Sequence, residues 1–252
     1  MTVHFAPALW AVFVFLHKSF SHCLRSKGWF YLSKKKMTTY LALLCDLDGT
    51  LANSEPQHCS AWLEMLHEDY QLDYDEHWFE QWIGTSDRVV ADWVIKEHQL
   101  AVTQQGLIDG KQKRFHHLVK TAGEGFPGVA EELGKIAEHF PIAIATNSGR
   151  ADTDVVIPAL SLDRFTNVVV TATDVKNMKP APDIYLLAAE RLGVHAGACI
   201  AIEDSKPGGE AAKAAGCYLI GLNDGVDMAD EIVHDNAGAL ARAREILSTV
   251  YV

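Results

Sequence analysis

Short apolar runs alternate with helix-forming segments along most of this chain, and this alternation constrains the fold more than any other feature. The runs that fit buried strands cover residues 40–45, 142–145, 168–171, 199–202 and 218–221. Helical patterns lie between them, for example from Asp183 to Leu192 and from Gly208 to Ala215. Strands that alternate with helices predict an α/β fold in which a parallel sheet is covered by helices on both faces.

One segment interrupts this alternation. Residues 54–122 show no strand pattern, and their apolar residues recur at helical spacing, as at Trp62, Leu63 and Leu66. We therefore predict a small helical cap domain over residues 54–122, inserted into a Rossmann-like catalytic core made of residues 37–53 and 123–252. A domain tethered beside the end of the first strand is well placed to close over a site and exclude water.

The first 36 residues differ in composition from the rest. No Asp or Glu occurs before Asp46, while Lys and Arg recur in this leader. The apolar run from Phe5 to Leu16 is too short to span a membrane, which takes about 20 residues. An organelle transit segment and an upstream extension outside the fold both fit this composition. We favour the extension, with Met37 as the working start.

Composition narrows the kinds of partner. The 252 residues carry a formal net charge of −11, which argues against nucleic acid because phosphate backbones favour clustered Lys and Arg. The 5 cysteines are odd in number and show no CxxC spacing, so we expect reduced thiols in the cytoplasm. We also expect a monomer that binds no membrane.

The first strand pattern ends in two acids and a turn, Asp46-Leu47-Asp48-Gly49-Thr50. Gly49 allows a sharp change of chain direction after the acids. A calcium loop is the rival interpretation, but such a loop places Gly at its sixth position and follows a helix. Here Gly stands fourth and the preceding run is strand-like, so the acids are predicted at a strand end.

Further polar residues stand at the ends of the later strand patterns. Thr146, Asn147 and Ser148 follow one of them and offer donors for phosphate oxygens. Lys179 precedes two prolines, and Glu203-Asp204 closes the pattern that begins at Cys199. Ligands of parallel sheets bind beyond the carboxyl ends of the strands. Clustered carboxylates with hard oxygen atoms favour Mg²⁺ as the cation.

These motifs, in this order, resemble the four motifs of the haloacid dehalogenase superfamily. The resemblance covers nearly everything from Met37 onward, and the cap position is similar to the subgroup of β-phosphoglucomutase and sugar-phosphate phosphatases. Within that subgroup, the stretch Ser54 to Trp62 is similar to a branch of fructose-1-phosphate phosphatase-like proteins.

The resemblance implies a role for each motif residue. Asp46 would attack phosphorus and become an aspartyl phosphate, and Asp48 would act as general acid and base. Thr146 and Lys179 would stabilise the charge of the transition state. The implied Mg²⁺ ligands are the Asp46 carboxylate, the Asp48 carbonyl and Asp204, with Glu203 ligating or nearby. Because dehalogenases lack the second acid, the resemblance favours phosphate chemistry.

The same resemblance gives candidate substrate-binding residues. Asn147 and Ser148 are implied by the core motifs, and His58 by the stretch after the first motif. In the cap, Arg88 belongs to a segment that resembles a specificity loop, residues 84–88. Lys113 is a further candidate, although Lys111, Lys113 and Arg114 together are typical of a solvated helix face.

Three functions remain open from the sequence. A Mg²⁺-dependent phosphatase would hydrolyse small phosphorylated metabolites such as fructose 1-phosphate, with water resolving the aspartyl phosphate. A β-phosphoglucomutase-type mutase would return the phosphate to a sugar and would need a bisphosphate. A non-catalytic binding module would be expected to lack the nucleophile, the acid or the lysine, and all three are present. We favour the phosphatase.

Overall fold

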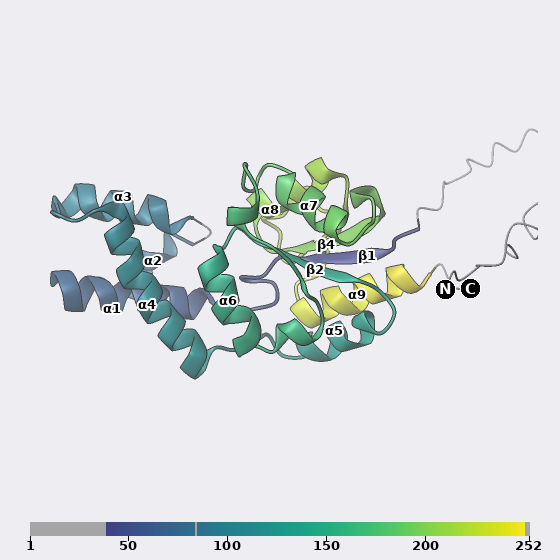
Figure 1. Ribbon diagram of the computed structural model, residues 1–252, viewed down its shortest axis with the longest axis horizontal. Helices are drawn as coiled ribbons and strands as arrows, with labels where there is room; N and C mark the ends of the chain where they lie inside the picture. Colours follow the sequence, from purple (N-terminus) through teal and green to yellow (C-terminus); the bar gives the residue numbers. More distant parts are fainter. Residues whose placement is uncertain (1–38, 84, 250–252) are drawn as a thin grey trace, which may run out of the picture. The chain divides into compact units, whose positions relative to one another are not determined.

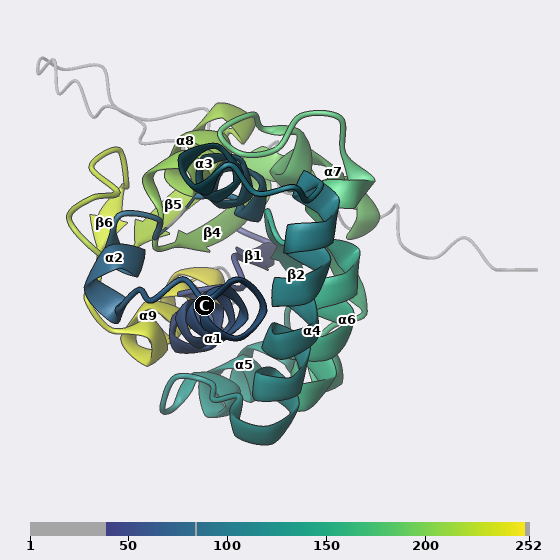
Figure 2. The ribbon, with the colours of Figure 1, turned by 90° about the vertical axis from the view of Figure 1, so that its left-hand side faces the viewer.

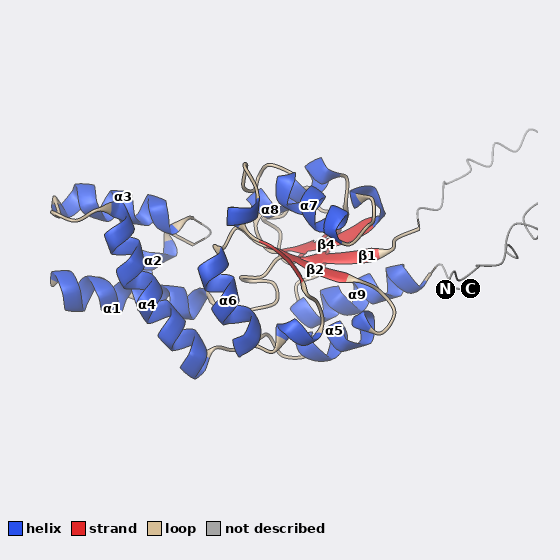
Figure 3. Ribbon diagram, viewed as in Figure 1, coloured by secondary structure: helices blue, strands red, loops and turns tan. Residues whose placement is uncertain are grey.

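The computed structural model describes residues 39–83 and 85–249. The predicted leader, residues 1–36, and Gly84 lie outside these described residues. Within them, the strands form one parallel sheet in the order β3-β2-β1-β4-β5-β6, shown in red in Figure 3. This arrangement confirms the predicted Rossmann-like α/β class.

The strand bounds match the predicted runs closely. They are β1 (Ala42–Cys45), β2 (Ile142–Ala145), β3 (Val168–Val170), β4 (Cys199–Glu203), β5 (Tyr218–Gly221) and β6 (Glu231–Ile232). The predicted runs did not include β6. This two-residue strand pairs only at the edge of the sheet, beside β5.

Alternate residues of each strand point to opposite faces, and helices cover both faces (Figure 1). Leu43 packs on one face with α5 (Val129–Ala137), α6 (Arg150–Ala159) and α9 (Asn236–Ser248). Leu44 packs on the other face with α7 (Asp183–Arg191) and α8 (Lys206–Ala215). Strands buried on both faces explain why the sequence shows continuous apolar runs rather than alternation.

Among the described residues between β1 and α5, the regular elements are all helices. The segment contains α1 (Glu55–Tyr70), α2 (Glu76–Glu80), α3 (Asp87–His98) and α4 (Gln104–Ala122). These helices share an apolar cluster of their own, around Trp62, Met65 and Val94. Helix α4 also runs alongside α6 (Figure 2). None of the described helices is long and apolar enough to cross a membrane.

Candidate active site

The strand ends at one edge of the sheet carry the residues that form the site. Asp46 follows β1 and is 7% exposed, and Lys179 is 8% exposed. The Lys179 ammonium donates to Asp46 Oδ1 and to Glu203 Oε1, each at 2.5 Å. Asp46 follows β1 and Lys179 lies in the loop between β3 and α7, so residues 133 positions apart along the chain are in direct contact.

Glu203 is fully buried, and both of its carboxylate oxygens accept hydrogen bonds from protein donors. Its Oε1 also accepts from the Tyr185 hydroxyl at 2.8 Å, and its Oε2 accepts from the backbone and hydroxyl of Ser205. A β-carbon at position 208 would lie 1.9 Å from Oε1, so Gly208 leaves room for this carboxylate. These contacts show that Glu203 holds Lys179 in place.

The Asp204 carboxylate packs directly against Gly49, at the turn that follows Asp48. Thr50 Oγ1 donates to Asp204 Oδ1 at 3.3 Å. Gly49 has φ of +79°, and a β-carbon there would approach Asp204 Oδ2 to 2.1 Å. Both the left-handed backbone and the close approach therefore require glycine at this position.

The site contains more negative than positive charge. Oxygen atoms of Asp46, Glu203 and Asp204 lie within 4.8 Å of one another, and Lys179 is the cation among them. Burial raises the pKa of Asp46 well above its ordinary value, Lys179 opposes this, and the neighbouring carboxylates add to it. Burial and Glu203 raise the pKa of Asp204 to about 7. A cluster of hard oxygen ligands short of positive charge fits a divalent cation such as Mg²⁺.

Asp48 is surrounded by hydroxyl groups. Its carboxylate accepts from Ser54 Oγ and Ser148 Oγ, each at 2.5 Å, and from Thr146 Oγ1 at 3.4 Å. His58 Nε2 lies 3.9 Å from Oδ1. Burial would raise the pKa of Asp48, but His58, Ser148 and Ser54 outweigh it and hold this pKa below its ordinary range. Asp48 is therefore ionised at neutral pH.

The remaining predicted substrate-binding residues differ in their surroundings. Asn147 binds the backbone of Lys179, through Oδ1 at 3.0 Å and Nδ2 at 3.3 Å, so its amide fixes the lysine loop. Arg88 is exposed on α3. Lys113 is also exposed, and it lines a surface hollow with Glu64 and Arg114. No described contact joins Arg88 or Lys113 to Asp46 or Asp48, and their substrate-binding role stays a prediction.

The expectation for Lys111 is wrong. Lys111 is fully buried, not part of a solvated face, and its ammonium donates to His58 Nδ1 at 2.6 Å and to Asp87 Oδ2 at 2.8 Å. No sequence pattern indicated a role for Ser54 or Tyr185. The sequence does contain a signal for the burial of Lys111. Leu107, Lys111 and Phe115 follow one another at four-residue spacing, which places them on one face of α4, and that face is buried.

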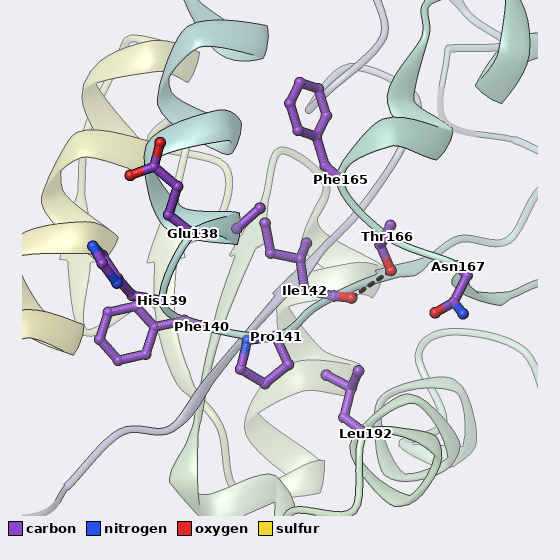
Figure 4. Close-up of a pocket in the computed structure, with 10 residues that line it drawn as sticks. Glu138, His139, Phe140, Pro141, Ile142, Phe165, Thr166, Asn167 and Leu192 are labelled. Atoms are coloured by element: carbon purple, nitrogen blue, oxygen red, sulfur yellow. Dashed lines mark hydrogen bonds between the residues drawn. The ribbon is translucent and has the colours of Figure 1, made fainter.

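A second hollow lies at the other end of β2. It has a volume of about 370 Å³ and is lined by residues 137–142, 165–167 and Leu192 (Figure 4). Thr166 Oγ1 donates to the Ile142 carbonyl at its edge, at 2.5 Å. None of the predicted site residues lines it.

The fold and the site define a Rossmann-like α/β protein whose acids, hydroxyls and lysine gather at the carboxyl edge of a parallel sheet. The chain belongs to the haloacid dehalogenase-like hydrolase family, whose model matches residues 43–222. It is therefore an enzyme of this hydrolase type, as the resemblance implied.

Individual relatives agree with this membership. The chain is 32% identical over 177 residues to fructose-1-phosphate phosphatase YqaB of Escherichia coli, covering 70% of this chain and 93% of that protein. It is 31% identical over 219 residues to a phosphorylated carbohydrates phosphatase of Thermotoga maritima, covering 83% and 97%. The crystal structure of a putative β-phosphoglucomutase from Thermotoga maritima superposes with a TM-score of 0.71 at 28% identity, covering 82% of this chain and 100% of that one.

Proposed function

We propose that this enzyme is a Mg²⁺-dependent phosphatase that hydrolyses small phosphate monoesters, in particular sugar phosphates similar to fructose 1-phosphate. The observation that carries the proposal is the shared cluster of Asp46, Lys179 and Asp204 beside the hydroxyl-bound Asp48. The two phosphatases of Escherichia coli and Thermotoga maritima described above support the same class of substrate.

Asp46 is the proposed nucleophile. Lys179 binds its Oδ1 and, among the described residues, no donor is found on Oδ2, which leaves that oxygen to form the bond to phosphorus. The bond from phosphorus to the ester oxygen breaks as the Asp46–phosphorus bond forms. The ammonium of Lys179 then lies beside the phosphoryl oxygens, whose negative charge it stabilises.

Asp48 is the proposed proton carrier. The negative charge of a bound phosphate raises its pKa, so Asp48 can take up a proton and give it to the departing alkoxide. The regenerated carboxylate, stabilised by Ser54 and Ser148, then takes a proton from the water that attacks the aspartyl phosphate. This second step releases inorganic phosphate and restores Asp46.

The proposed Mg²⁺ ligands are the carboxylates of Asp46 and Asp204 and the main-chain carbonyl of Asp48, with Glu203 at their side. When bound, Mg²⁺ supplies positive charge next to the nucleophile and the phosphate. Glu203 takes a supporting place because its oxygens already bind Lys179, Tyr185 and Ser205.

We further propose that α1 to α4 act as a cap domain over residues 54–122, and that the protein works as a cytoplasmic monomer without nucleic-acid or membrane partners. The four described cysteines are free thiols, which supports a reducing compartment. Gel filtration tests whether the protein is a monomer, and fractionation of cells tests its cytoplasmic location.

The test of function measures phosphate release from a panel of sugar phosphates, with and without Mg²⁺. We expect release that depends on Mg²⁺ and is lost in Asp46→Asn, whereas Asp163→Asn, the same change at an exposed site, keeps it. After acid quenching, the peptide that contains Asp46 should carry a phosphoryl group. Equal release by the wild type and Asp46→Asn would refute the proposal, and faster formation of glucose 6-phosphate from glucose 1-phosphate than of phosphate would favour the mutase.

A further inference from the structure

A buried cation lies in the helical segment next to the proposed proton carrier. Lys111 of α4 is 0% exposed, and its ammonium donates to His58 Nδ1 and to Asp87 Oδ2. It also lies over the Phe115 ring, 4.9 Å from the ring centre, and His58 stacks on the same ring. Through His58 this cation is one contact away from Asp48.

Asp87, the first residue of α3, neutralises this cation. Its Oδ2 binds Lys111 at 2.8 Å and its Oδ1 accepts from the Trp62 indole at 3.0 Å. Burial would raise the pKa of Asp87, but Lys111 and His58 outweigh burial and lower it. The Asp87 side chain therefore stays ionised, and it remains 25% exposed.

The charges around His58 are mainly negative. Glu55, at the start of α1, is near enough to Asp48 and His58 for their charges to influence its pKa, which burial raises. Asp48, Glu55 and Asp87 thus surround one histidine, with Lys111 as the opposing buried cation. An anionic group on the far part of a substrate would meet this excess of negative charge.

We propose that Asp87 is a specificity-determining residue that restricts the site to esters with one phosphate on an otherwise uncharged molecule. This inference rests on the proposed phosphatase activity and narrows its substrate class. By pairing with Lys111, Asp87 cancels the positive charge that would otherwise attract a second phosphate, so Asp48 and Glu55 are left without an opposing charge near His58. Sugar monophosphates fit such a site, and sugar bisphosphates do not.

The first experiment uses the wild-type protein alone. It compares kcat/KM for phosphate release from fructose 1-phosphate and fructose 1,6-bisphosphate, and from glucose 1-phosphate and glucose 1,6-bisphosphate. We expect a preference of about tenfold or more for the better monophosphate over its bisphosphate. Added NaCl should reduce this preference, because salt screens repulsion at the partly exposed Asp87.

The second experiment removes the charge of Asp87. Asp87→Asn should lower KM for the bisphosphate by about tenfold while changing kcat/KM for the monophosphate much less. Asp92→Asn is the matched control, because Asp92 is an exposed acid on the same helix and binds Gln104. Should Asp87→Asn fail to fold, the wild-type preference and its salt dependence decide the matter.

Several outcomes would overturn the inference. A wild-type enzyme that hydrolyses the bisphosphate as well as the monophosphate would do so, as would equal shifts in the Asp87→Asn and Asp92→Asn variants. Loss of bisphosphate turnover in Arg88→Ala would show that Arg88 binds a second anion. Absence of Mg²⁺-dependent release from every ester would instead refute the proposed function itself.

Discussion

Replacing Glu203 by Gln tests how the site holds its lysine. The change preserves the shape of a side chain with no exposed surface but removes its charge. Lys179 then keeps only Asp46 as an ionic partner, and the new amide nitrogen must face donors on Lys179, Tyr185 or Ser205. The variant therefore has both a missing charge and a buried clash between donors.

The size of the effect follows from these contacts. Removing one partner of a buried ion pair costs about 3 to 5 kcal/mol. We expect about 3 kcal/mol here, at the low end, because Lys179 retains Asp46. For a protein of this size, that loss lowers the melting temperature by about 6 to 12 °C. Phosphate release should also fall sharply, since the ammonium beside the phosphoryl group is no longer fixed.

Thermal unfolding followed by circular dichroism measures the stability, and phosphate release measures the activity. Glu210→Gln is the matched control, because Glu210 is exposed on α8 and its loss should leave both properties near the wild-type values. A Glu203→Gln protein with the melting temperature and activity of the wild type would show that Glu203 does not hold Lys179.

Three further changes test neighbouring contacts. Tyr185→Phe removes one hydroxyl donor from Glu203 and should cost about 1 kcal/mol in thermal unfolding. Gly208→Ala should cost more than Tyr185→Phe in the same assay, because its β-carbon would overlap the Glu203 carboxylate, which three partners hold. Hydrogen bonds from Arg242 and, to a smaller extent, Tyr218 lower the pKa of Glu231 to about 2. The Arg242–Glu231 pair therefore stabilises the fold at pH values above the ordinary Glu pKa, and this stabilisation is lost as the pH falls. Arg242→Gln should therefore be less stable than the wild type at pH 6, with a difference that shrinks below about pH 4.5.

The sheet was predictable from the sequence because its strands are buried on both faces. Continuous apolar runs such as 142–145 have no other simple explanation when helices flank them. The edge strand β6 was not predictable, because Glu231–Ile232 is too short to show a pattern and lies on a partly exposed edge. The positions of Asp46 and Asp204 followed from topology, since each directly follows a strand and the carboxyl ends of parallel strands meet at one edge. Lys179 lies in the long loop between β3 and α7, and strand ends alone do not place it.

The supporting contacts were less predictable. Tyr185 reaches Glu203 from α7, and Ser54 reaches Asp48 from the start of α1. Such contacts depend on how a helix is rotated against the sheet, which a periodic pattern does not define to within a hydrogen-bond length. Topology thus predicts which residues form the site, while packing decides which neighbours fix them.

The pair of the buried Lys111 and the partly exposed Asp87 has no evident explanation in stability alone. Lys111 occupies a place in the apolar stripe of α4 between Leu107 and Phe115, where an apolar side chain would fit the pattern. Apolar replacement of a buried ion pair is often neutral or stabilising, because the desolvation of two charges offsets their attraction. The structure places this costly pair against His58, within one contact of Asp48. Its position beside the reacting groups, rather than its contribution to folding, is what connects the helical segment to the chemistry of the sheet edge.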